Sequence, residues 1–155
     1  MPDEVNNEIL KDLINLSPES RTSYHEEMLL DKLREAFLYM PFEITSKNFD
    51  YNFNGVKEGY IIEIDEPFKF KPLVYTDKNN ISHLFLFTDK DELKNGIKGK
   101  LNVFIITSSD IAENFKKANY DYVDINPFSK CGISMKFSSF LNLFNDESYF
   151  VFKEE

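Results

Sequence analysis

The spacing of the apolar residues changes near residue 40, and this change limits the fold more than any other feature of the sequence. Up to Leu38, apolar residues recur at the three- and four-residue intervals of amphipathic helices. From Met40 onward the spacing approaches two, which is the period of a half-buried strand. The sequence therefore predicts helices at the N-terminal end, followed by a region dominated by strands.

Two helices are predicted before this change. The first covers Val5 to Leu16, where the apolar residues follow helical spacing. The second is expected to start at Ser17-Pro18-Glu19 or at Ser23-Tyr24-His25-Glu26, because both segments carry residues that cap helices. Its apolar stripe extends to Leu38, and Pro41 is expected to end it.

The rest of the chain is predicted to combine strands with short helices. The predicted strands cover residues 40–44, 60–64, 68–75, 81–87, 101–107, 120–125 and 149–152. Short helices are predicted at 89–97 with Asp89 as the cap, at 111–115, and after Ser134. The turn at residues 77–80 favours antiparallel pairing of the strands that it joins.

This pattern suits hairpins better than regular βαβ units, so the predicted fold class is α+β. We expect a single domain with a mainly antiparallel or mixed sheet of about five to seven strands. Helices would pack on the sheet, and the N-terminal helices would lie across it. Residues 1–27 are interpreted as an N-terminal helical extension and residues 28–155 as the α+β domain. A length of 155 residues, 42% of them apolar, fits one core that includes the extension.

The charge balance bears on the class of partner. Asp and Glu number 27 against 18 Lys and Arg, a net charge of −9. This balance disfavours nucleic acid, whose binding needs clustered cations, and it suits a basic protein partner. The N-terminus lacks the features of a signal peptide, and no apolar run approaches the roughly 18 residues of a membrane span. We therefore expect a cytoplasmic protein without membrane contact, and the single Cys131 fits a reducing compartment.

No cofactor or metal site is predicted. Residues 50–55, Asp-Tyr-Asn-Phe-Asn-Gly, spell the start of an EF-hand loop, but Ile61 stands where the bidentate Glu is needed, so we interpret them as an Asn-Gly turn. His25 and His83 lie outside zinc-binding patterns. The five glycines form neither a P-loop nor a dinucleotide-binding fingerprint.

No catalytic residues are predicted either. The chain lacks a G-x-S-x-G nucleophile elbow, and Lys130 is the one basic neighbour that could activate Cys131. A less favoured hypothesis is a small enzyme in which His83 acts with Asp89 or Asp124 as an acid–base pair. That hypothesis requires His83 to lie within hydrogen-bond reach of a carboxylate.

Several separated segments carry a family resemblance. They are Leu33-Arg34-Glu35-Ala36-Phe37-Leu38-Tyr39-Met40-Pro41, residues 84–93 around Phe87-Thr88-Asp89, residues 123–128 around Asn126-Pro127, and Phe137-Ser138-Ser139-Phe140-Leu141. In this order they resemble the SseB protein N-terminal-domain family, over roughly residues 28 to 145. The chain departs from that pattern at Met40, where another aliphatic residue is expected, and in its Asn-rich segment 45–59.

The resemblance implies an interaction module rather than a known enzyme. It points to Phe87, Thr88, Asp89, Asn126 and Pro127 as candidate binding positions. The same residues also have a structural interpretation, because a buried strand running into a capped helix needs Phe87-Thr88-Asp89, and Asn126-Pro127 turns the chain after a strand.

The predicted function is a non-catalytic, cytoplasmic, bacterial module that binds another protein. The alternative in the same class is an acidic immunity or inhibitor protein for a basic toxin. These two functions differ in their response to salt, because a charge-driven complex weakens steeply as the ionic strength rises and an apolar contact does not.

Overall fold

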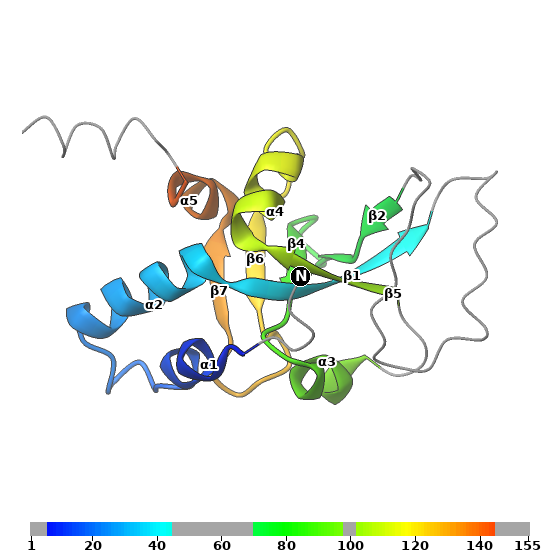
Figure 1. Cartoon of the computed structure of the whole chain (residues 1–155). Coiled ribbons are helices and arrows are strands. Elements are labelled where there is room, and N and C mark those ends of the chain that lie inside the picture. The colour runs from blue at the N-terminus through cyan, green and yellow to red at the C-terminus, as the bar shows by residue number, and fades with distance from the viewer. Residues whose placement is uncertain (1–5, 45–69, 98–101, 145–155) are drawn as a thin grey trace, which may run out of the picture.

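The computed structural model describes residues 6–44, 70–97 and 102–144, and it confirms the predicted α+β class (Figure 1). The described helices are α1 (Glu8–Ile14), α2 (Ser23–Glu35), α3 (Lys90–Gly96), α4 (Ser108–Phe115) and α5 (Phe137–Asn142). The described strands are β1 (Phe37–Ile44), β2 (Phe70–Pro72), β3 (Val74–Thr76), β4 (Ser82–Leu86), β5 (Asn102–Thr107), β6 (Tyr122–Ile125) and β7 (Ile133–Lys136). The turn predicted at 50–55 and the strands predicted at 60–64 and 149–152 lie outside the described residues.

The described strands form two sheets rather than one. The first has the order β2-β1-β5 and is antiparallel throughout. The second has the order β3-β4-β6-β7, in which β4 and β6 are parallel and the other pairs are antiparallel. Backbone hydrogen bonds of 2.8 and 3.0 Å between Tyr39 and Phe87 join the two sheets. The strand predicted over 68–75 is divided between them, with β2 in one sheet and β3 in the other.

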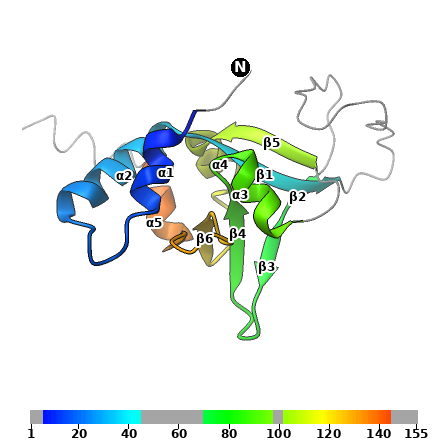
Figure 2. The same ribbon diagram turned by 90° about the horizontal axis from the view of Figure 1, so that it is seen from below.

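One core is shared by the helices and both sheets. The fully buried apolar side chains come from α1, α2, α4, α5, from strands of each sheet and from the residue that follows β4: Leu10, Ile14, Leu33, Leu38, Met40, Leu84, Leu86, Phe87, Ile111, Val123, Ile125 and Phe140. Helices α1 and α2 lie side by side, and the turn between β3 and β4 points away from them (Figure 2). Helix α1, which belongs to the predicted extension, is therefore part of the core.

The second helix begins at Ser23, one of its two predicted starts, but it ends earlier than predicted. Its N-cap is Thr22, whose hydroxyl accepts the backbone N–H of His25 at 3.3 Å, while the His25 ring accepts the Thr22 backbone N–H at 3.1 Å. Histidine thus takes the place of the acidic residue in a capping box. The helix ends at Glu35, and Pro41 lies inside β1 opposite Val103 instead of ending the helix. The position of Leu38 fits the apolar spacing of a helix and also that of a strand. Its pairing with Ile106 of β5 makes it part of the strand.

The helix predicted to begin at Ser134 is also wrong at its start. Residues 133–136 form β7, paired with β6, and α5 begins only at Phe137. Ile133 and Met135 pack against the core, whereas Ser134 and Lys136 are exposed. Four alternating residues are too few for the sequence pattern to separate a strand from the first turn of a helix.

The predicted hairpin and the predicted cap of α3 are confirmed. Strands β3 and β4 are antiparallel, and Oδ1 of Asp77 in their turn accepts the backbone N–H groups of Asn79 and Ile81. Asp89 caps α3 by accepting the backbone N–H of Glu92 at 2.9 Å. Within the described ranges, no helix has the length and apolar character that crossing a membrane requires.

Candidate functional site

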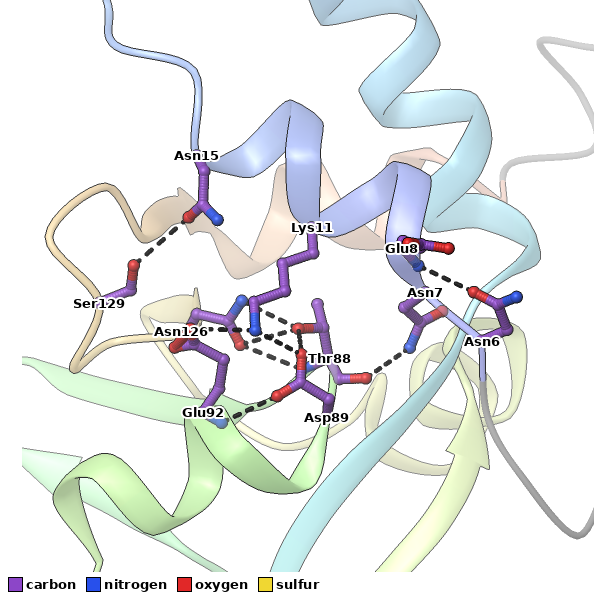
Figure 3. Close-up of polar contacts among 10 residues, drawn as sticks. All are labelled: Asn6, Asn7, Glu8, Lys11, Asn15, Thr88, Asp89, Glu92, Asn126 and Ser129. Carbon is purple, nitrogen blue, oxygen red and sulfur yellow. Dashed lines mark hydrogen bonds and ion pairs between the residues drawn. The ribbon is translucent and has the colours of Figure 1, made fainter.

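The residues singled out by the family resemblance meet where β4 and β6 end. Phe87, Thr88 and Asp89 follow β4, and Asn126 and Pro127 follow β6. Because β4 and β6 are parallel, their carboxyl ends lie at the same edge of the sheet, and the two segments become neighbours (Figure 3). The structure therefore brings the residues from both segments together.

Thr88 and Asn126 are joined by two reciprocal hydrogen bonds in the interior of the protein. Oδ1 of Asn126 accepts the backbone N–H of Thr88 at 3.0 Å, and Nδ2 of Asn126 donates to the Thr88 hydroxyl at 3.0 Å. Both residues are fully buried. Asn126 has a φ of 55°, in the left-handed region that Asn tolerates better than most residues. The pair therefore fixes the strand ends and the direction in which the chain leaves β6.

Helix α1 and its N-cap residue close this junction with two side chains spaced four residues apart. Nδ2 of Asn7 donates to the carbonyl oxygens of Phe37 and Thr88 at 2.7 and 2.8 Å. Nζ of Lys11 lies 2.9 Å from Oδ2 of Asp89 and 3.5 Å from Oε1 of the buried Glu92 (Figure 3). These contacts give the junction a structural role, because the polar groups of Asn7, Lys11, Thr88, Asp89 and Asn126 bond to other parts of the same chain.

The charges at the junction stabilise each other. The hydrogen bond to Asp89 raises the pKa of Lys11 above its ordinary value and outweighs the opposing effect of burial. Burial tends to raise the pKa of Asp89, but the hydrogen bonds from Lys11 and from the Glu92 backbone lower it overall. Lys11 and Asp89 are therefore both charged at neutral pH.

A second region offers more exposed side chains, on the side of the four-stranded sheet that faces away from the core. Alternation along the strands places seven residues there: Tyr75, His83, Phe85, Tyr122, Asp124, Ser134 and Lys136. We call these seven residues the outer face. None of them belongs to the buried core cluster of the described residues.

Aromatic rings form a continuous strip across part of the outer face. Tyr75 stacks on Phe85 with ring centroids 5.9 Å apart, and Phe85 meets Phe128 edge to face at 5.7 Å. Tyr75 is 54% exposed and Phe128 is 41% exposed. We call Tyr75, Phe85 and Phe128 the aromatic strip. Contiguous exposed aromatic surface on a globular protein marks interaction sites more often than isolated apolar residues do.

Beside the strip, His83 lies between two carboxylates. Its Nδ1 is 3.1 and 3.2 Å from the two carboxylate oxygens of Asp124, and its Nε2 is 3.1 Å from Oδ2 of Asp77. The imidazole also stacks on the ring of Tyr122, with centroids 5.3 Å apart. Partial burial lowers the pKa of His83, but the hydrogen bonds to Asp124 and Asp77 outweigh that effect and raise the pKa overall.

This geometry limits the acid–base chemistry open to His83. The imidazole meets the predicted requirement for a carboxylate within reach, through Asp124, whereas Asp89 is paired with Lys11 at the sheet edge. A general base held by one carboxylate needs its second nitrogen for the substrate. Here the second nitrogen is bonded to Asp77.

The remaining candidates from the sequence are distributed elsewhere. His25 caps α2, and Cys131 is half-buried in the loop before β7. Among the described residues, no group of three His, Cys, Asp or Glu side chains is arranged to hold a metal ion. Asp77 and Asp124 approach opposite nitrogens of His83, so these three groups do not converge on one point.

Sequence reasoning did not identify the aromatic strip or Asp77. The alternation of His83 and Phe85 with Leu84 and Leu86 places the first two on one side of a strand. The rings that join Phe85 come from β3 and from the loop after β6, and a single sequence does not show which strands pair.

The pKa of His83 leads to a prediction for stability. Its folded-state pKa is raised above the ordinary 6.5, so the stability that it adds should be complete below about pH 6.5 and lost as the pH rises through the folded pKa. The pKa of Asp77 is lowered from 3.8, first by the hydrogen bond from the Ile81 N–H and then by His83. The stability that Asp77 adds is therefore lost only as the pH falls below about 3.8, through its folded pKa. We therefore expect urea midpoints of the wild type and His83→Gln to differ most between about pH 4 and pH 6.5 and to converge toward pH 8.5. A difference that grows with rising pH would contradict this assignment.

Comparison with protein-family models, with curated proteins and with solved structures found no match to this chain.

Proposed function

We propose that this chain is a non-catalytic module that binds another protein through its outer face and aromatic strip, and that the partner is basic. The aromatic strip is the observation that carries the proposal. Tyr75 and Phe128 lie at its ends and are exposed, while Phe85 lies half-buried between them. Rigid aromatic side chains give large contact areas at low entropic cost, and they are enriched in the centres of protein interfaces.

The charge of the chain selects the kind of partner. With a net charge of −9, the protein attracts a basic surface and repels an acidic one over the range of a Debye length. Asp77 and Asp124 lie beside the strip, so carboxylates are present where the contact would form. An acidic inhibitor of a basic toxin is one kind of protein that these properties suit.

The contacts of His83 support the binding module better than the hypothesis of an enzyme that uses His83 as an acid–base group. Both nitrogens of His83 contact carboxylates, whereas a general base held by one carboxylate needs its second nitrogen for the substrate. The residues of the SseB resemblance support the proposed binding surface indirectly. Their contacts hold α1, α3 and the loop after β6 in place, and this loop carries Phe128 of the aromatic strip.

Replacing Tyr75 with alanine should weaken partner binding about tenfold, because tyrosine is among the residue types that carry most of the binding energy of an interface. The matched control is Tyr24→Ala, since Tyr24 is 65% exposed but lies on α2. The wild type and both variants are immobilised and incubated with lysate of the source cells at low and high salt. We expect one partner that the wild type and Tyr24→Ala retain at low salt and that Tyr75→Ala loses.

Three results would count against the proposal. A partner retained equally by Tyr75→Ala and the wild type would place the binding surface elsewhere. Binding that is unchanged between about 50 and 500 mM salt would contradict a basic partner. Failure to retain any partner under either condition would remove the support for a binding module. Circular dichroism of Tyr75→Ala checks that the exposed substitution leaves the fold unchanged.

A further inference from the structure

The contacts of His83 determine how many protons its ring carries. Each ring nitrogen lies 3.1 or 3.2 Å from a carboxylate oxygen, on Asp124 for Nδ1 and on Asp77 for Nε2. An ionised carboxylate only accepts hydrogen bonds, so both nitrogens must be donors for both contacts to be favourable. The geometry is therefore that of an imidazolium ion held between two carboxylates.

Loss of the proton must break one of these contacts. A neutral imidazole has one N–H, so its other nitrogen would direct a lone pair at a carboxylate oxygen. Nδ1 lies 3.2 and 3.1 Å from the two carboxylate oxygens of Asp124, whereas Nε2 approaches the single oxygen Oδ2 of Asp77 at 3.1 Å. The Nδ1–Asp124 contact is thus the better supported of the two, and the contact with Asp77 is the one expected to open.

The two oxygens of Asp77 have different partners. Oδ1 accepts the backbone N–H groups of Asn79 and Ile81 at 2.8 and 3.1 Å, which holds the carboxylate within the turn. In the described part of the chain, the hydrogen bond to Oδ2 comes from His83. Deprotonation of His83 therefore leaves Oδ2 of Asp77 as a fixed, half-buried acceptor without its donor.

Tyr75 lies close to the donor of this hydrogen bond, with its ring centroid 6.1 Å from that of His83. It lies two residues before Asp77 and directly opposite His83 in the β3–β4 pairing, so these three residues share one side of the hairpin. The ring of Tyr75 is mostly exposed. A guanidinium group can stack on an aromatic ring and at the same time donate to a carboxylate, which an ammonium group does less well.

We propose that Tyr75 and Asp77 form a binding site for an arginine side chain of the basic partner, and that protonated His83 occupies the carboxylate of this site in the partner's absence. The inference rests on the proposed function and names the group that the partner contributes. When His83 releases its proton to solvent, the imidazole withdraws as a donor and the guanidinium takes its place on Oδ2 of Asp77.

The charged and titratable groups around His83 agree with this placement. Asp124 and Tyr122 face the ring from β6, and Asp77 and Tyr75 face it from the hairpin. Lys136 lies on β7, at the far end of the row Tyr75–His83–Tyr122–Lys136. Its positive charge disfavours a cation near β7, which leaves the hairpin side as the favourable side for arginine.

The test is a titration of the full-length protein with an acetylated, amidated tetra-arginine peptide, followed by two-dimensional NMR at pH 6 and pH 8. We expect the largest chemical-shift changes at Tyr75, Asp77 and His83. The peptide should bind about fivefold more tightly at pH 8 than at pH 6, because only molecules with neutral His83 can bind the guanidinium group. His83→Gln should bind equally at both pH values. Asp77→Asn should bind weakly at both, and Asp91→Asn, which removes an exposed carboxylate on α3, should behave as the wild type.

Each contrary outcome has a definite meaning. Equal wild-type affinity at both pH values, or unchanged binding in Asp77→Asn, overturns the arginine site. Shifts that lie away from the hairpin also overturn it. If a cellular partner still depends on Tyr75 in the retention experiment, the proposed function stands while this inference fails. A tetra-glutamate peptide that shifts the same residues would overturn the assignment of a cationic group.

Discussion

Replacing Gly132 with alanine is expected to destabilise the protein by about 3 kcal/mol, because the added methyl group would meet backbone rather than a movable side chain. A Cβ atom on Gly132 would lie 2.1 Å from the carbonyl oxygen of Asn126 and 3.0 Å from that of Ile125. Relief requires the segment after β6 to move, and the same segment holds Asn126 in its buried pair with Thr88. Thermal unfolding should show a midpoint lowered by about 6–12 °C.

Gly96→Ala is the matched control for this prediction. A Cβ atom on Gly96 would lie 2.1 Å from the ring of Phe128, which is 41% exposed and can rotate away. Gly96 is also within α3, where alanine is favoured over glycine by about 1 kcal/mol. The stability loss should therefore be smaller than for Gly132→Ala. Equal losses in the two variants would show that the backbone contact at Gly132 is relieved easily.

The sequence determined the element types best where the periodic pattern was long or where a cap was local. Asp89 was predicted as the cap of α3 because three residues and one backbone N–H are enough to form that contact. The end of α2 was missed because Leu38 and Met40 are compatible with both periods, and only pairing with β5 resolves them. Ser134 was misassigned for the same reason, since β7 has four residues.

The candidate site was less accessible to sequence reasoning than the fold. Alternation with Leu84 and Leu86 indicates the side of the strand on which His83 lies. Its neighbours are set by two separate pairings: the antiparallel hairpin brings Asp77, and the parallel contact with β6 brings Asp124. The choice of partner strand depends on the packing of the whole core, which no local pattern contains.

The same parallel contact makes Asn126 a sensitive position. Removing its side chain leaves the buried backbone N–H of Thr88 without its acceptor, which costs about 1–3 kcal/mol. Alanine also tolerates the left-handed backbone of Asn126 poorly, at a further cost of about 1 kcal/mol. We therefore expect Asn126→Ala to lower the free energy of unfolding by about 3 kcal/mol. Asn126→Gly should lose less, because glycine adopts this φ without strain.

A double-mutant cycle tests whether this loss comes from the pair itself. Thr88→Val removes the hydroxyl that accepts Nδ2 of Asn126, so it should be destabilising alone. Once Asn126→Ala has removed the amide, the Thr88 hydroxyl no longer has this donor, so removing the hydroxyl costs less stability. The double variant should therefore be more stable than the sum of the two single losses implies. Urea unfolding should give a coupling of about 1 kcal/mol. Additivity within about 0.5 kcal/mol would mean that the two side chains act independently, and the loss in Asn126→Ala would then be attributed to the unpaired Thr88 backbone N–H and to the backbone conformation of residue 126.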